Sequence, residues 1–333
     1  MGLRHDVDRV AAAADFSGVV RVERDGVVEL DLAYGLADRA HAIPCTVATR
    51  FAVASGAKGF TALTVMALVV DGMLRLDTRA RELLGDDLPL IDDAVTVEQL
   101  LAHRSGIGDY LDEEVHPDPN AYAMPVAAQQ LATSVDHLAI LDGYPQRHPP
   151  GEVFTYCNGG YVVLAILAER ATGTAFHELV EQRVCRPAGL TRSGYLRSDE
   201  LPGDVALGYV SMDGVVRSNV FHLPVRGSGD GGASTTLDDV STFWRALDAG
   251  AIVPTAVVAE MTRVRSIDDH RAYGLGFWLH PSRDVVSLTG YDAGVSFRSV
   301  HDRDRAVRHT VIGNTTDGAW PVIRVLADTL DAP

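Results

Sequence analysis

The 333-residue sequence predicts an α/β fold in which an antiparallel sheet, flanked by helices, is interrupted by an all-α subdomain. Runs rich in β-forming residues lie near both ends of the chain, and a middle stretch of helical pattern separates them. Strands from the two ends must pair to bury their faces, so one sheet should receive both ends. We expect a single domain over 1–333, with the sheet part in 1–72 and 205–333 and the helical subdomain in about 73–204.

The N-terminal part should supply a helix, a hairpin and a buried helix. Residues 3–14 have a helical pattern, and in "SGVVRVERDGVVELDLAYG" the pair Asp25-Gly26 separates two β-rich runs, which is a strong hairpin signal. The run from Lys58 to Val70 is apolar on most sides and long enough to favour a buried helix over a strand. Ser55 should lie at the start of that helix.

The middle and C-terminal parts also contain local signals for helices and strands. "TVEQLLAHRSG" opens with a Thr96/Gln99 capping box, and "GGYVVLAILAERATG" has helix periodicity that ends at a glycine. "VALGYVSMDGVVRSN" repeats the Asp-Gly hairpin pattern, and "TTLDDVSTFWRALDAG" reads as a capped helix. Strands are expected over 272–279, 284–289 and 294–313, the last with a turn at "DRD", before a terminal helix from about 318.

Composition excludes several classes of protein. The net charge of −16 disfavours nucleic acid and anionic membrane surfaces as partners, because binding phosphate requires clustered Lys and Arg. The three cysteines have no C-x-x-C spacing and are expected to be free thiols. The N-terminus lacks an apolar core of signal-peptide length, and "FTALTVMALVV" is too short to span a bilayer, so we expect a cytoplasmic protein. Nothing in the sequence indicates an oligomeric state.

One lysine stands among 28 arginines. It is Lys58, three residues after Ser55 in "FAVASGAKGF", and residues at i and i+3 share one face of a helix. Arg cannot lose its proton in a protein, whereas a desolvated Lys can, and a serine needs such a base to become a nucleophile. S-x-x-K recurs by chance in many chains, so the motif alone indicates little.

Two further stretches complete a pattern. In "PPGEVFTYCNGGYVVL", Tyr156 and Asn158 precede a helix; a tyrosine near a lysine can move protons, and an asparagine can both donate to and accept from a substrate amide. In "VSLTGYDAGVSF", Thr289-Gly290 lies on a strand where the backbone can approach a ligand closely. Each has an ordinary structural explanation by itself, but the order S-x-x-K, Y-x-N and T-G is far more specific.

With these motifs the sequence resembles the superfamily of serine β-lactamases, penicillin-binding proteins and esterases, and most of all hydrolases related to class C β-lactamases. The resemblance covers nearly the whole chain and includes "LLAHRSGIGDY", "GDGGASTTLDDVSTFW" and "YGLGFWL". It implies Ser55 as the acyl-enzyme nucleophile, Lys58 as its base and Tyr156 as the second acid/base. It further implies Asn158 as a substrate contact and the backbone N–H groups of Ser55 and Tyr291 as an oxyanion hole.

The third motif departs from the family pattern. The family normally has Lys or His where this chain has Leu288, ahead of Thr289, Gly290 and Tyr291, so recognition of a substrate carboxylate by that cation is lost. By resemblance, Asn314 in "VIGNTTD" matches a position able to contact a carboxylate and could compensate in part.

Other chemistries find less support. The sequence has no G-x-S-x-G elbow, no H-E-x-x-H and no Walker loop, and no metal or other cofactor is expected. His103 and Asp109 flank "HRSGIGD", where a second site centred on Ser105 is a weak alternative, and the charges of "DEEVHPD" read as a solvated loop rather than a cation site.

We therefore expect a serine hydrolase that acts on a small ester or amide, as an esterase or a peptidase-like enzyme. The first alternative is a protein that binds penicillin or hydrolyses β-lactams, of the β-lactamase or D-Ala-D-Ala carboxypeptidase type. The second is a non-catalytic relative that binds a ligand in the same cleft. In each case the partner is a small-molecule ester, amide, peptide or β-lactam.

Overall fold

The computed structural model describes residues 2–268 and 271–331, and within them the largest sheet has eight strands. Their order is β2-β1-β14-β13-β12-β11-β10-β9, with every pairing antiparallel. The strands are β1 (Gly18–Arg24), β2 (Val27–Tyr34), β9 (Ser266–Asp268), β10 (Arg271–Tyr273), β11 (Trp278–Leu279), β12 (Val285–Asp292), β13 (Val295–Asp302) and β14 (Val307–Gly313). The predicted α/β fold with an antiparallel sheet is confirmed.

The two ends of the chain meet in the middle of this sheet. β1 pairs with β14 along its whole length, from Gly18 opposite Gly313 to Arg24 opposite Val307. The β1–β2 hairpin turns at Asp25-Gly26 as predicted, and both turn residues have positive φ, 50° and 76°. Such a turn favours Gly and tolerates Asp, which is why the sequence signal was reliable.

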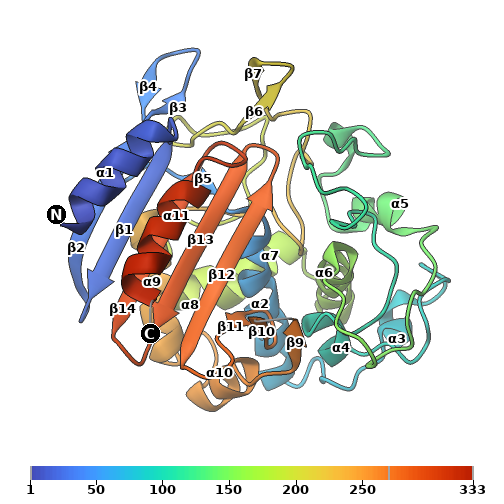
Figure 1. The fold of residues 1–333 in the computed structure, drawn as a ribbon. Helices are drawn as coiled ribbons and strands as arrows, with labels where there is room; N and C mark the ends of the chain where they lie inside the picture. Colours follow the sequence, from blue (N-terminus) through green and yellow to red (C-terminus); the bar gives the residue numbers. More distant parts are fainter. Residues whose placement is uncertain (1, 269–270, 332–333) are drawn as a thin grey trace.

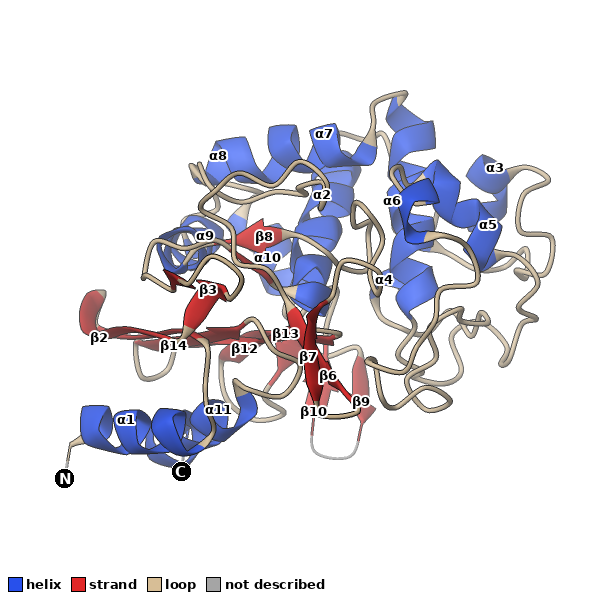
Figure 2. Ribbon diagram, turned by 90° about the horizontal axis from the view of Figure 1, so that it is seen from above, coloured by secondary structure: helices blue, strands red, loops and turns tan. Residues whose placement is uncertain are grey.

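Helices cover both faces of the sheet (Figure 2). α1 (Leu3–Ala13) and α11 (Trp320–Leu326) lie side by side on one face and close a small apolar core there. α2 (Lys58–Val70), α9 (Leu237–Asp248) and α10 (Thr255–Met261) lie on the other face, over the main core. α2 has the predicted bounds, and nearly all its side chains are buried because it runs between the sheet and the remaining helices.

The middle of the chain forms helices, and those between residues 80 and 172 lie beside the sheet in Figure 1. These are α3 (Ala80–Leu84), α4 (Val97–Leu101), α5 (Leu138–Leu141), α6 (Asn158–Thr172), α7 (Phe176–Val180) and α8 (Arg186–Ala188). The Thr96/Gln99 capping box forms at α4, and α6 ends at Gly173 with φ 69°. They fall within the range expected for a helical subdomain; the division into two parts stays a prediction.

Some strands differ from expectation. The run 272–279 forms two short strands, β10 and β11, because a turn containing Gly274 and Gly276 separates them, the latter with φ 92°. The run 294–313 forms β13 and β14 around the predicted "DRD" turn. Three small two-stranded sheets pair β3 (Leu36–Asp38) with β4 (Ile43–Pro44), β5 (Phe51–Ala52) with β8 (Ser234–Thr235), and β6 (Tyr209–Met212) with β7 (Val215–Ser218), the last being the second predicted hairpin.

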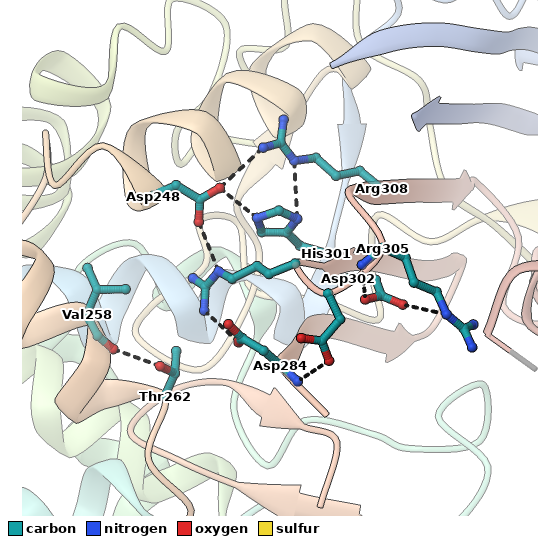
Figure 3. A network of polar contacts seen from close by, with 10 residues as sticks. Asp248, Val258, Thr262, Asp284, His301, Asp302, Arg305 and Arg308 are labelled. Atoms are coloured by element: carbon teal, nitrogen blue, oxygen red, sulfur yellow. Dashed lines mark hydrogen bonds and ion pairs between the residues drawn. The ribbon is translucent and has the colours of Figure 1, made fainter. Parts of the chain in front are cut away.

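A polar network fastens the C-terminal end of α9 to two central strands (Figure 3). His301 on β13 donates from Nε2 to Asp248 Oδ2 at 2.7 Å, and Arg308 on β14 donates from Nε to His301 Nδ1 at 3.2 Å. These bonds join the end of α9 to β13 and β14. Among the helices of the described residues, none combines the length and apolar character needed to cross a bilayer.

Candidate active site

Ser55 lies in a single 3-10 turn, η1 (Ala54–Ala57), that joins β5 to α2. The turn is held from both sides: Val53 N–H donates to Ala233 O at 2.9 Å, and Gly56 N–H donates to Val53 O at 2.8 Å. Ala54 has φ 44°, in the left-handed region that residues with a Cβ rarely occupy. Such strain persists only where the surroundings impose it, so the direction of the Ser55 side chain is fixed by the fold.

β12 presses against this turn at Gly290. A Cβ at Gly290 would lie 2.0 Å from Val53 O and 3.1 Å from Gly56 N, so only glycine fits there. The sequence predicted a close approach of the backbone to a ligand at this point. The structure shows that this backbone approaches the turn that carries Ser55, and its approach to a ligand stays a prediction.

Lys58 is the first residue of α2, and its side chain is buried, with the residue 2% exposed. Its Nζ donates to Ser55 Oγ at 2.9 Å, to Asn158 Oδ1 at 2.7 Å and to the backbone oxygen of Asp230 at 2.7 Å. The amine also lies 4.9 Å from the centre of the Tyr156 ring. The structure therefore brings Ser55, Lys58, Tyr156 and Asn158 together around the buried amine nitrogen.

The Tyr156 hydroxyl interacts with the Ser55 hydroxyl. Burial raises the pKa of Tyr156 well above its usual value, the charge of Glu113 adds to the rise, and the contact with Ser55 opposes it. The phenol therefore holds its proton in the free protein. This makes Tyr156 suited to pass a proton through Ser55 or Lys58 rather than to stand as a phenolate.

The Asn158 side chain is held at both ends by the protein. Its Oδ1 accepts from Lys58, and its Nδ2 donates to Leu111 O at 2.9 Å. The backbone N–H groups of Asn158 and Gly159 donate to the two carboxylate oxygens of Asp109 at 2.6 and 2.8 Å. The Asp109 side chain therefore caps the N-terminus of α6. Burial raises the pKa of Asp109 to about 6, although these two hydrogen bonds oppose the rise.

Three carboxylates that were not predicted from the sequence border Ser55. The Asp230 carboxylate accepts from Tyr110 Oη at 2.5 Å, while Glu113 and Asp292 line the same cavity as Ser55. Burial raises the pKa of Asp292 to about 7, and the charges of Asp230 and Glu113 add to it. Three carboxylates therefore line the cavity at Ser55, while Arg271 lines the second cavity there together with Glu113. The glycines of "SGDGG" around Asp230 were the available signal.

The third motif divides between the site and the core. Thr289 and Tyr291 line an open cavity next to Ser55, as the pleat of β12 directs alternate side chains to one face. Leu288 faces the other way: it is 5% exposed and lines a small closed cavity with Phe60, Phe243 and Phe297. The structure does not place the Leu288 side chain beside Ser55.

Asn314, expected to contact substrate, is also placed away from Ser55. Its Nδ2 donates to Leu36 O at 3.0 Å and to Leu207 O at 2.9 Å, and it lines neither cavity that contains Ser55. These bonds tie the end of β14 to β3 and to the loop at Leu207. Ser105, the weak alternative nucleophile, is buried and is likewise absent from both linings.

Two cavities meet at Ser55. One is a hollow of about 130 Å³ whose walls are mainly apolar side chains, among them Met124, Leu207 and Leu223. The other, of about 420 Å³, is open and aromatic, with Trp278 and Trp320 in its lining. Within the described parts of the chain, no three His, Cys, Asp or Glu side chains are placed to hold a metal ion.

Comparison with known sequences places these features in a family. A family model described as Beta-lactamase matches residues 4–325. A D-aminopeptidase from Brucella anthropi is 30% identical over 282 residues, which cover 82% of this chain and 51% of that protein. Penicillin-binding protein 4 from Amycolatopsis lactamdurans is 34% identical over 188 residues, 54% of this chain and 45% of that protein. The chain thus spans about half the length of these curated relatives.

Solved structures agree. A penicillin-binding protein from Bacillus halodurans is 32% identical and superposes with a TM-score of 0.91, covering 97% of this chain and 100% of that one. A D-amino acid amidase from Ochrobactrum anthropi SV3 has a TM-score of 0.79 at 22% identity, over 99% of both chains, which is a likeness of fold alone. The resemblance read from the sequence motifs is confirmed, and the chain belongs to the Beta-lactamase family.

Proposed function

We propose that this chain is a serine hydrolase that forms an acyl-enzyme on Ser55 and cleaves a small amide or ester. The observation that carries the proposal is the contact of 2.9 Å between Lys58 Nζ and Ser55 Oγ, with the amine buried and surrounded by protein acceptors. A serine needs a base within hydrogen-bond reach, and a desolvated amine is one that can serve. The names of the relatives, D-aminopeptidase and penicillin-binding protein, support the same chemistry.

The reaction runs in two steps. Ser55 Oγ attacks the substrate carbonyl carbon, and its proton passes to Lys58 in the neutral amine form. Tyr156 then relays a proton to the leaving nitrogen or oxygen as the bond to carbon breaks, which leaves the acyl group on Ser55. Water attacks this ester in the second step, with Lys58 and Tyr156 moving the protons in reverse. Backbone N–H groups of Ser55 and Tyr291 are proposed, from the family resemblance, to hold the oxyanion.

The charges beside Ser55 favour a substrate with a protonated amine. Asp230, Glu113 and Asp292 line the cavity that contains the nucleophile, while the position that carries a cation in the family is Leu288, turned into the core. An ammonium group would be attracted by this cleft and a carboxylate repelled. An amino acid amide or ester with a free amine fits best, its apolar part facing the hollow around Met124 and Leu223.

A panel of substrates tests the proposal. Alanine p-nitroanilide in both stereoisomers, p-nitrophenyl acetate and a chromogenic cephalosporin would be compared, with intact-mass detection of adducts on Ser55. We expect turnover of the anilide or ester and none in the Ser55→Ala variant. Turnover that survives in Ser55→Ala contradicts the acyl-enzyme.

Penicillin binding is the second candidate, favoured by the 32% identity and full coverage of the penicillin-binding protein from Bacillus halodurans. A stable penicilloyl adduct on Ser55 without anilide turnover would favour it. A protein that neither turns over nor acylates would instead be a ligand-binding relative.

A further inference from the structure

We infer that His103 positions Tyr156 against Ser55, and that it does so as a hydrogen-bond acceptor rather than as a packing ring. The inference rests on the proposed role of Tyr156 in proton transfer. His103 belongs to the loop after α4 and touches none of the reacting atoms, so it is a positioning residue.

His103 holds the chain on both sides of Tyr156. The N–H of Thr155 donates to the His103 backbone oxygen at 2.9 Å, and the N–H of Cys157 donates to His103 Nδ1 at 3.1 Å. The rings of His103 and Tyr156 also lie against each other, with centroids 4.3 Å apart. One residue therefore fixes the backbone before Tyr156, the backbone after it, and the Tyr156 ring itself.

The backbone of His103 adopts a left-handed conformation where it makes these contacts. Its φ is 54°, in a region that few residues other than Gly occupy, with His, Asn and Asp the most frequent among them. Such a conformation persists where the surrounding structure imposes it, and it is frequent at functional sites.

The state of the ring also indicates an acceptor. Nδ1 accepts from Cys157, so the ring proton is on Nε2, which is buried and has no hydrogen-bond partner in the described part of the chain. Burial, and then the charge of Lys58, hold the pKa of His103 well below its usual range, so the ring stays neutral. A buried N–H without a partner is unfavourable. If the ring served for packing alone, an apolar side chain would avoid that cost.

A pair of substitutions of similar size separates the two roles. His103→Asn keeps an acceptor near the place of Nδ1 and tolerates a positive φ, whereas His103→Leu removes the acceptor; both remove the ring contact with Tyr156. With alanine p-nitroanilide, we expect His103→Leu to lower kcat roughly 10- to 100-fold, as a misplacement of about 1 Å does, with little change in KM. His103→Asn should keep kcat near the wild-type value although its melting temperature falls.

His137→Leu is the matched control. His137 is also 1% exposed, bonds Thr133 O through Nδ1 at 2.9 Å, and has a buried Nε2 without a partner among the described residues, but it contacts neither Tyr156 nor Ser55. It should lower the melting temperature and leave kcat unchanged. If His103→Leu does not fold, His103→Gln replaces it, because the longer amide reaches the place of Nε2 rather than Nδ1 and should lose kcat in the same way.

A double-mutant cycle closes the test. If His103 acts through Tyr156, then His103→Leu should cause no further loss of kcat in the Tyr156→Phe background. An equal loss of kcat in the Leu and Asn variants, or a loss that persists in that background, overturns the inference. A Tyr156→Phe variant with full activity removes the proposed role of Tyr156 as well, whereas an inactive Tyr156→Phe beside a fully active His103→Leu refutes the inference alone.

Discussion

Replacing Lys58 by Arg tests whether the single lysine is needed for its removable proton or for its charge. The arginine keeps a positive charge among Ser55 Oγ, Asn158 Oδ1 and the Asp230 oxygen, all of which lie within 2.9 Å of the present amine. It cannot give up its proton, so it cannot take the one from Ser55.

The expected magnitude follows from the role assigned to the amine. Loss of a general base costs about 10²- to 10⁴-fold in rate, or about 3–5 kcal/mol in the barrier. The Lys58 side chain is also tightly packed, because it is buried against Tyr156 and Tyr161. The larger guanidinium should therefore reduce the free energy of unfolding by about 1–3 kcal/mol. The two effects must be measured separately.

The assay is the rate at which p-nitrophenyl acetate acylates Ser55, followed as the burst of p-nitrophenol, at a temperature where thermal melts show each variant folded. Lys58→Met is the companion variant, because it removes both the charge and the base. Both variants should lose at least about 10²-fold. If Lys58→Arg acylates within about tenfold of wild type while Lys58→Met does not, positive charge is what the site needs, and the reasoning fails.

Three more predictions follow from the same site. Because the pKa of Asp292 is raised to about 7, its carboxyl group becomes charged as pH rises through that value. KM for an amine-bearing substrate should fall as pH rises through about 7, whereas KM for p-nitrophenyl acetate should not change. Asp292→Asn should make the two substrates respond alike to pH. Gly290→Ala places a Cβ 2.0 Å from Val53 O and should lower the free energy of unfolding by about 1–3 kcal/mol together with acylation of Ser55, as urea melts and burst kinetics would show; a stable, active variant contradicts the packing described. The pKa of Asp109 is raised to about 6 in the folded protein, so the native state binds more protons than the unfolded chain between about pH 4 and 6. As pH rises through that interval, the free energy of unfolding of the wild type should fall by about 3 kcal/mol more than that of Asp109→Asn, as urea melts would show. Equal dependence of the unfolding free energy on pH in the two proteins would refute this prediction.

Local signals in the sequence predicted much of the fold. The Asp-Gly pairs at 25–26 and 213–214 both turn hairpins, and the apolar run from Lys58 to Val70 is the buried helix α2, because turn chemistry and periodicity act over a few residues. The short strands β10 and β11 were not separated in advance, since a two-residue strand has too few residues to show alternation.

The site was predictable where chemistry and spacing coincide within one segment. Ser55 and Lys58 are neighbours on the chain, and a lysine that is unique in the composition drew attention to them. The direction of Leu288 depends on which face of β12 meets α2, and the meeting of Glu113, Asp230 and Asp292 joins loops far apart in sequence. His103 was noticed only as a neighbour of Ser105, because its contacts with Thr155 and Cys157 depend on how the loops fold back.

The pairing of β1 with β14 has a consequence for how the protein is made. On the ribosome β1 (Gly18–Arg24) emerges well before the strand that covers its second edge, which ends at residue 313, and before the strand that presses on the Ser55 turn, which ends at residue 292. At about 5–20 residues per second, β1 waits roughly 15–60 seconds for this partner. During synthesis the nascent chain therefore exposes an open strand edge, a hazard for aggregation that a chaperone would cover, and the nucleophile is not assembled until β12 has been translated.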